Sequence, residues 1–451
     1  MAELTTAEEL GVFTAEQVEI LSAQRVEPDW LRAQRQEAHR TFASMPMPDT
    51  RPEEWRYTAI AELLDLGALK LGDERPPVTS DADLPAQLGE MIRQVGDSAG
   101  RIVQVGSSVV QRELSAELAE KGVILTSLEQ AVREHPALVK EHLGSAVVPD
   151  DGKFAAQNGA FWTGGTFVYV PANVKVELPL RSFRWLDAAG SSLFGRTLIV
   201  AEEFAEVAVV DELASADFDG PAYSNGATEI VSAEGAKVTY VAVQRFGRGV
   251  RHLTTDRLVT GRDGKITTAY LTLGSDVTRA DIQCRLRAPG SHVDMLGLYI
   301  AEGTQHLDHE TLQDHIAPHA SSNLLFKGAL MDRGRSVFRG LIRVHPNAQR
   351  TDAYQTNRNL ILSPGARADS LPNLEIAADD VRCSHAATVG QLDAEEMFYL
   401  LSRGIRHKEA MRLVIFGFFG EVLEQIQIEP VKQELVRAIE GKLYASGRGD
   451  A

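Results

Sequence analysis

Cysteine is scarce in this chain, since Cys284 and Cys383 are the only two among 451 residues. Two cysteines cannot build a disulfide framework, which favours a protein of the reducing cytoplasm. They also cannot supply the four thiolates of a cysteine-only metal centre. Any soft-metal site that uses them must therefore be completed by another chain.

Positive charge and long apolar runs are also in short supply. The 46 Lys and Arg residues are outnumbered by 63 Asp and Glu residues, and the net charge of −17 opposes nucleic-acid binding. The most apolar run, Leu413–Gly420, is far shorter than the roughly 20 residues of a membrane-spanning helix. The acidic, polar stretch Met1–Glu9 lacks the charged-then-apolar pattern of a secretory leader. We therefore expect a cytoplasmic protein that binds neither nucleic acid nor membrane.

Hydrophobic patterning divides the chain into three regions. Residues 1–150 show helical spacing followed by a small α/β appendage. From 151 to 392 the helical period disappears, and short runs rich in Val, Ile, Leu, Thr and Tyr alternate with glycine-containing turns. Residues 393–451 return to helix, with Asp393 as a candidate N-cap and Gly404 as a candidate C-cap. We expect a mainly β fold with a helical region on each side.

The strand region contains a degenerate repeat anchored by glycines. The anchors are Gly235, Gly264, Gly290, Gly334 and Gly365. They recur at intervals of 26 to 31 residues, except for a longer step after Gly290 that indicates an insert around His306 to His319. Such a period, built only from strands and turns, predicts a parallel β-helix (β-solenoid), because a sandwich would show hairpin turns roughly every 8 to 12 residues. Open solenoid ends need protection, so we expect the flanking helices to cover both.

The segment Val381–Gly390 carries a candidate half-site for a metal. Cys383 and His385 are two residues apart in a strand-like run, and alternate strand residues project from the same face. A thiolate and an imidazole would then lie side by side, as metal ligands do. The alternative is that both residues only pack, because free cysteines are often buried.

Four histidines and the second cysteine are further candidates. The histidines are His306, His309, His315 and His319. Their spacing can bind a metal, but neighbouring carboxylates could equally hold them in a structural polar network. Cys284 alternates with polar residues in a strand-like run, which indicates a side chain that points into the solenoid core.

The assembled motifs resemble the SufB/SufD family, the scaffold proteins of the SUF iron–sulfur cluster assembly system. The resemblance rests on segments 305–315, 350–362, 366–376, 383–390 and 398–405, and covers nearly the whole chain. Within the family, the sequence Cys383-Ser-His-Ala-Ala-Thr-Val-Gly390 is similar to the SufD branch, as are Glu27–Leu31 and Glu54–Thr58.

This resemblance implies a right-handed parallel β-helix that pairs with a SufB-like homologue through its last coils. It implies that the C-terminal helices (393–451) bind the SufC ATPase. His385 would face SufB and help to hold a transient, shared iron–sulfur cluster, with Cys383 as a further candidate ligand. No phosphate-binding loop is recognisable, so we expect this chain to be a non-catalytic scaffold that binds no nucleotide.

Two alternatives to that function remain. One is a SufB-like scaffold that acts as a homodimer without a partner of another kind. A homodimer could also form when this chain is isolated from its partners. The other is a solenoid polysaccharide lyase or hydrolase, which needs paired carboxylates. Its candidate acids are Glu302, Asp308, Glu310 and Asp314. Only 6% of the residues are aromatic, which leaves few platforms for stacking sugars.

Overall fold

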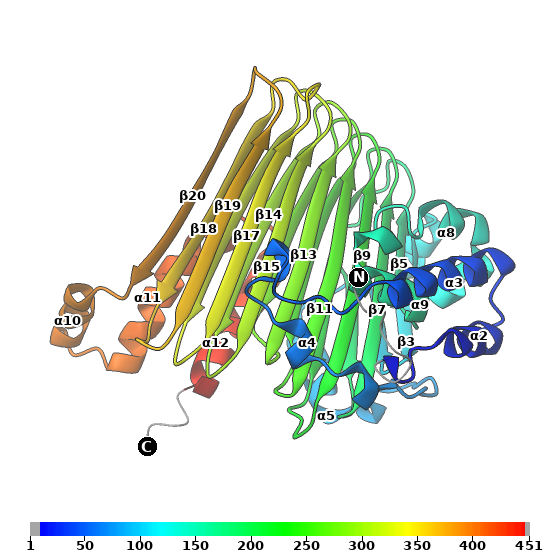
Figure 1. Cartoon of the computed structure of the whole chain (residues 1–451), viewed down its shortest axis with the longest axis horizontal. Coiled ribbons are helices and arrows are strands. Elements are labelled where there is room, and N and C mark those ends of the chain that lie inside the picture. Colours follow the sequence, from blue (N-terminus) through cyan, green and yellow to red (C-terminus); the bar gives the residue numbers. More distant parts are fainter. Residues whose placement is uncertain (1–9, 447–451) are drawn as a thin grey trace.

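The computed structural model describes residues 10–446, so the stretch Met1–Glu9 lies outside the described part. Two sheets face each other and form a parallel β-solenoid (Figure 1). One sheet has the order β19-β17-β15-β13-β11-β9-β7-β5-β4, with β1 beside β7. The other has the order β20-β18-β16-β14-β12-β10-β8-β6-β2-β3. The prediction of a mainly β parallel solenoid with helices at both ends is confirmed.

The solenoid strands lie between residues 166 and 391. They are β5 Thr166–Val170, β6 Leu180–Leu186, β7 Ser191–Ala201, β8 Glu206–Ser215, β9 Ala222–Ser232, β10 Lys237–Arg245, β11 Val250–Thr260, β12 Lys265–Thr272, β13 Val277–Leu286, β14 His292–Ala301, β15 His306–His315, β16 Ser321–Leu330, β17 Arg335–Val344, β18 Asp352–Ile361, β19 Arg367–Ile376 and β20 Arg382–Gln391. From β6 onward each strand pairs in parallel with the strand two places further along the chain, so equivalent side chains of successive coils stack on one another.

The segment around His306 to His319 is a regular coil, and the predicted insert is wrong. β15 pairs along its whole length with β13 and with β17. Gly290 precedes β14 in one sheet, whereas Gly334 precedes β17 in the other. The longer step in the repeat arises because the anchoring glycine moves from the turn on one side of the solenoid to the turn on the other side.

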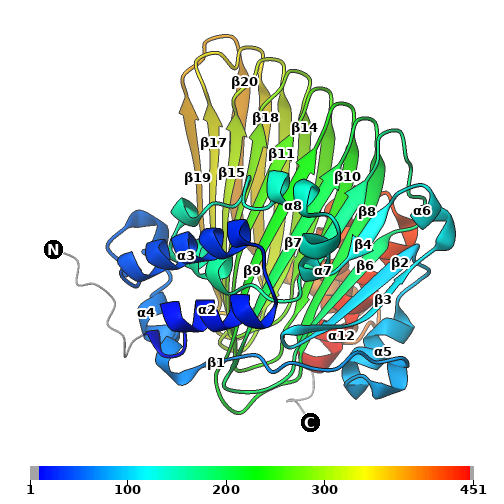
Figure 2. The same cartoon turned by 90° about the vertical axis from the view of Figure 1, so that its right-hand side faces the viewer.

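The N-terminal region covers one outer face and the first coil. Its elements are α2 Ala15–Gln24, α3 Asp29–Ser44, α4 Ile60–Leu63, β1 Lys70–Leu71, α5 Ala86–Gln94, β2 Gly100–Val105, β3 Ser108–Leu114, α6 Ala116–Glu120, β4 Ile124–Thr126, α7 Leu128–Glu134, α8 Pro136–His142 and α9 Lys153–Phe161, with short 3-10 turns at Glu53–Trp55, Leu66–Ala68, Asp81–Asp83 and Pro149–Asp151. Phe42 and Phe161 pack against Phe194 and Tyr223 on the outer face of β7 and β9. Leu118 of α6 is buried with lumen residues such as Val168, so this end of the solenoid is covered as predicted (Figure 2).

The C-terminal helices leave the last coil open, contrary to the prediction that they cover it. They are α10 Ala394–Ser402, α11 His407–Leu423 and α12 Glu429–Ser446. Apolar residues of α11 and α12, among them Ile415, Phe419 and Leu435, pack on the outer face of β10, β12, β14 and β16. This face offers a continuous apolar surface, which the helices bury by running back along the solenoid (Figure 1). Across residues 10–446, no helix combines the length and apolar character needed to cross a membrane.

A buried ion pair ties α12 to the first coils. Glu434 accepts two hydrogen bonds from Arg181 of β6, at 2.7 and 2.9 Å. It also accepts one from the backbone N–H of Gly96, at 2.7 Å. The three hydrogen bonds satisfy the carboxylate in a buried setting, where charge-assisted bonds are strongest. The C-terminal helix therefore holds together two segments that lie 253 and 338 residues from Glu434 in sequence.

The solenoid lumen combines close packing with buried polar groups. The Tyr299 hydroxyl donates to Asn359 and accepts from Asn357, at 2.6 and 3.0 Å. The His309 ring stacks on Tyr299, and its Nε2 lies 3.0 Å from the Thr272 hydroxyl. Burial lowers the pKa of His309 and of His315 to about 4. Both imidazoles are therefore neutral inside the folded lumen at pH 7.

We expect Gly328→Ala to destabilise the protein by about 1–3 kcal/mol, the usual cost of overpacking. A Cβ at Gly328 would lie only 2.0 Å from Tyr299 Cε2, and it would disturb the hydroxyl's bonds to the asparagines. Gly390→Ala is the matched control, because a Cβ there meets nothing within 4 Å. Urea unfolding measures both variants. Equal midpoints for the two would contradict the account of lumen packing.

We expect His309→Gln to reduce the loss of stability that follows acidification. The unfolded chain takes up a proton on this histidine as pH falls through about 6.5, whereas the folded chain does so only near pH 4. Between these values protons favour the unfolded state, so stability falls as pH falls. Urea unfolding at pH 7 and pH 5 should therefore show a smaller difference for the variant than for the parent. An unchanged difference would show that His309 does not carry this effect.

Candidate functional site

Cys383 and His385 lie on β20. Residues in register on successive coils form rows along the solenoid, and these two belong to rows whose side chains face the lumen, here called lumen rows. Cys383 and His385 are in register with Ala353 and Gln355 of β18, which are fully buried. Gln355 donates across the lumen to the carbonyl of Asn373 on β19, at 3.1 Å. In-register neighbours in a parallel sheet point to the same face. Both candidate ligands therefore project inward from the last coil, as their spacing predicts for a shared face.

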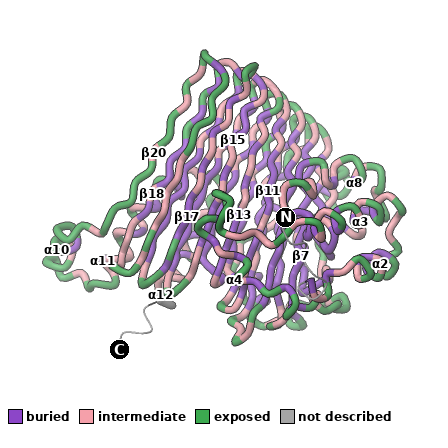
Figure 3. The backbone as a smooth tube through the Cα atoms, in the orientation of Figure 1, coloured by how far each residue is buried: buried purple, intermediate pink, exposed green. Residues whose placement is uncertain are grey.

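Within residues 10–446, no further coil stacks on the last one, so this coil is open. β19 and β20 are the terminal strands of their sheets, so each has one edge without a strand beside it. Leu374 and Ile376 of β19 occupy the lumen rows of buried Ile342 and Val344, yet both are exposed. Val389 of β20 is 50% exposed. Most of β20 is coloured as exposed in Figure 3. The end of the solenoid thus presents lumen-type apolar side chains and free strand edges to solvent.

The two candidate ligands differ in their surroundings. Cys383 is half-buried and packs against a small apolar cluster that includes Val344 and Ala353. Burial raises the pKa of the Cys383 thiol, so a metal or a cation is needed to favour the thiolate. His385 is exposed. Among residues 10–446, no three His, Cys, Asp or Glu side chains converge as a metal site. Donors from another molecule would have to complete a site here.

The histidine group on and after β15 is divided between two faces of the strand. His306 lies on the outer face, where its Nε2 is 2.8 Å from the Thr58 hydroxyl. His309 and His315 point into the lumen and bond to Thr272 and Ser322. His319 lies in the following turn, with a positive φ of 58°. These histidines cannot converge on one metal ion. Their contacts favour the alternative that they belong to structural polar networks.

An N-terminal segment covers the outer face of β15. Besides His306, the Thr58 hydroxyl contacts Asp308. The guanidinium of Arg279 pairs with Asp308 at 2.6 Å and lies 4.0 Å from the centre of the Trp55 ring. Two motifs that the sequence separates by about 250 residues, Glu54–Thr58 and His306–Glu310, therefore form one contact. Sequence reasoning missed it because nothing local pairs the two motifs.

The acids considered for sugar cleavage are engaged in ion pairs or hydrogen bonds. Glu302 pairs with Lys442 at 2.6 Å, and Asp314 Oδ1 lies 2.9 Å from His345 Nε2, within hydrogen-bond distance. Asp308 and Glu310 share Arg279. Glu302 and Asp314 are thus held by separate partners, and the one neighbouring pair, Asp308 and Glu310, is bridged by a guanidinium, with Asp308 also held by the Thr58 hydroxyl. These contacts favour a structural role for the four acids.

Cys284 lies in the lumen core, as predicted. It is fully buried on β13, and burial raises the pKa of its thiol to about 12. A protonated, enclosed thiol is a poor ligand and a poor nucleophile.

A separate exposed apolar surface lies on α10, next to the open end (Figure 1). Phe398 is 73% exposed and Tyr399 is 58% exposed. Leu401 is exposed on the same helix. Asp393 caps the helix by accepting from the backbone N–H of Glu395, at 2.7 Å, as predicted. Large exposed side chains of this kind, gathered on one helix, are typical of a protein contact surface.

Comparison with known proteins identifies the family. A model described as "SUF system FeS cluster assembly, SufBD core domain" matches residues 184–418, and one described as "SufBD protein N-terminal region" matches residues 10–181. The iron–sulfur cluster assembly protein SufD of Bacillus subtilis is 33% identical over 95% of this chain and 97% of its own length. SufB of the same organism is 27% identical over 92% of this chain and 90% of its own length. A SufBD family protein of Staphylococcus haemolyticus is 29% identical over 94% of this chain and 92% of its own length.

The family models together span most of the chain, and the match to SufD exceeds the match to SufB from the same organism. The chain belongs to the SufBD family of iron–sulfur cluster assembly proteins.

Proposed function

We propose that this protein is a SufD-type scaffold that pairs with a SufB-like homologue through its open last coil and helps to hold a nascent iron–sulfur cluster there. The observation that carries the proposal is that the exposed His385 and the half-buried Cys383 lie in the lumen rows of an uncovered coil. In every earlier coil these rows are closed by the coil above. Only here can side chains of the lumen reach a second molecule.

The open coil suits a partner that is itself a solenoid. Free edges of β19 and β20 can accept strand-to-strand or end-to-end contacts, and Leu374, Ile376 and Val389 supply apolar surface to bury. A homologue of the same fold would present a matching end. Family members named SufB and SufD both resemble this chain, which supports a pair of unlike homologues. A second copy of this chain would present the same apolar surface, so self-pairing of the isolated protein is the alternative.

The cluster itself is cargo that this chain holds only in part. His385 offers an imidazole nitrogen at the surface, whereas the half-buried Cys383 thiol is disfavoured as a thiolate until a cation binds. The remaining ligands would come from the partner. This division makes His385 the principal ligand from this side and Cys383 the secondary one.

The C-terminal region provides the second contact in this proposal. Phe398, Tyr399 and Leu401 of α10 form an exposed apolar surface, and we assign it to the SufC ATPase. In contrast, α11 and α12 use their apolar residues to pack on the solenoid, so they act as the support for α10. The chain acts as a scaffold in the cytoplasm, with nucleotide bound by SufC.

His385→Ala should leave folding and SufB pairing intact but remove most of the iron and acid-labile sulfide from the reconstituted complex. An exposed imidazole contributes little to core burial, so its loss acts on the cluster and not on stability. Cys383→Ala should have a smaller effect. The control is His142→Ala, on α8 and far from the open end (Figure 1). Full cluster content in His385→Ala would remove this histidine from the proposed site.

Phe398→Asp should abolish co-purification of SufC while leaving the urea midpoint and SufB pairing unchanged. The side chain is mostly solvent-exposed, so a charge costs little in the free protein but would be buried unpaired in a contact. Leu178→Asp is the control, because it changes an exposed apolar residue in the loop between β5 and β6. Retention of SufC by Phe398→Asp would place the ATPase contact elsewhere.

A further inference from the structure

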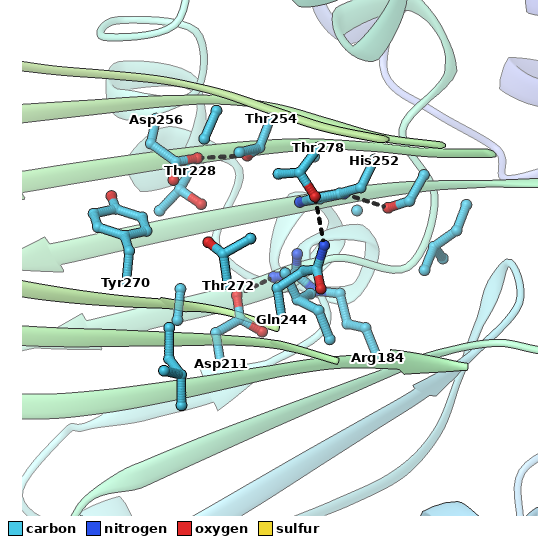
Figure 4. Close-up of a pocket in the computed structure, with 18 of the residues that line it drawn as sticks. Arg184, Asp211, Thr228, Gln244, His252, Thr254, Asp256, Tyr270, Thr272 and Thr278 are labelled. Atoms are coloured by element: carbon cyan, nitrogen blue, oxygen red, sulfur yellow. Dashed lines mark hydrogen bonds and ion pairs between the residues drawn. The ribbon is translucent and has the colours of Figure 1, made fainter. Parts of the chain in front are cut away.

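A small cavity lies between the two sheets in the first half of the solenoid (Figure 4). Its volume is about 30 Å³. An ordered water needs roughly 10–15 Å³ of such space, so the cavity has room for about two. Its polar lining includes Arg184, Asp211, Thr228, His252 and Asp256, all of them buried. The cavity is far from the open end and belongs to none of the surfaces assigned above.

The cavity contains an ion pair between Arg184 and Asp211, and each of these two side chains has one polar atom without a hydrogen-bond partner among the described residues. Asp211 Oδ2 accepts from Arg184 Nη2 at 2.8 Å and from the hydroxyls of Thr197 and Tyr240, each at 3.1 Å. Among the described residues, nothing donates to Asp211 Oδ1, and nothing accepts from Arg184 Nε. Asp211 is fully buried and Arg184 is 3% exposed. Leaving buried polar groups without partners is costly, and more so when the groups are charged.

The charge of the lining selects a neutral ligand. Arg184 supplies one positive charge, and Asp211 neutralises it. His252 adds no charge at neutral pH, because burial lowers its pKa to about 3. Asp256 is a second carboxyl group, so an anion would be repelled. No three His, Cys, Asp or Glu side chains converge as a metal site among residues 10–446, which argues against a cation held by the cavity.

We propose that this cavity is a binding site for ordered water. A water molecule donates to Asp211 Oδ1, and Arg184 Nε donates to water, which completes both partners of the buried ion pair. Hydroxyls such as that of Thr228 supply further contacts. Buried water of this kind makes about three hydrogen bonds and is retained as part of the fold. It would explain how a charged pair is accommodated between the two sheets.

A crystal structure of the whole chain, at a resolution that shows ordered water, is the first test. We expect at least one water within hydrogen-bond distance of Asp211 Oδ1 or Arg184 Nε. A second set of crystals is placed under xenon, which enters dry apolar cavities. Xenon in this cavity, an empty cavity, or the anomalous signal of a metal would each overturn the proposal.

Ala242→Val is the second test, because this residue lines the cavity and the added methyl groups occupy its volume. Displaced water would leave the ion pair without its extra partners, so the urea midpoint should fall. Filling a dry cavity would raise the midpoint or leave it unchanged, and that result would contradict the proposal. Ala208→Val is the matched control, since it adds the same groups to β8 at a half-buried position outside the cavity lining.

Discussion

In-register stacking of successive coils is the interaction on which the rest of this structure depends. Each lumen side chain meets the equivalent side chain of the coils before and after it, so a large residue requires a small one nearby. Tyr299 beside Gly328 and Phe326 beside Gly297 show this complementarity. The same rule makes the last coil exceptional, since its lumen residues have a neighbour on one side only. The candidate site is thus accessible because Cys383 and His385 lie on the coil at which the stack ends.

The sequence allowed much of the fold to be predicted, and the errors have physical causes. Strand runs at a period near one coil predicted the solenoid, because such a period has few other solutions. The glycine repeat led to the wrong prediction of an insert around His306 to His319. Each coil has two turns, and the anchoring glycine can lie in either of them. Gln355, Asn357 and Asn359 alternate as outward-facing residues would, yet they face the lumen. Tyr299, on β14 of the same sheet, and Ser370, across the lumen on β19, are hydrogen-bond partners of Asn357, and local sequence does not show them.

The candidate site was predicted in part by the same reasoning. The strand period places Cys383 and His385 on one face, and the structure puts both in lumen rows. Their access to solvent could not be inferred from the strand, because it depends on the C-terminal helices. Those helices were expected to cover the end, but they pack on the apolar outer face of β10 to β16 instead. The last coil is free because α11 and α12 pack on the outer face of the solenoid and not on its end.

The return of α12 to the first coils changes the mechanical character of the solenoid. A simple stack of coils is a one-dimensional array in which each unit contacts only its neighbours, so an end can fray without disturbing the middle. Here the Glu434 carboxylate joins the last helix to Arg181 and Gly96, near the opposite end of the array. The two terminal regions of the chain are thus in direct contact, so loosening one of them would weaken the contacts of the other. This contact joins directly two parts of the array that a simple stack would couple only through the coils between them.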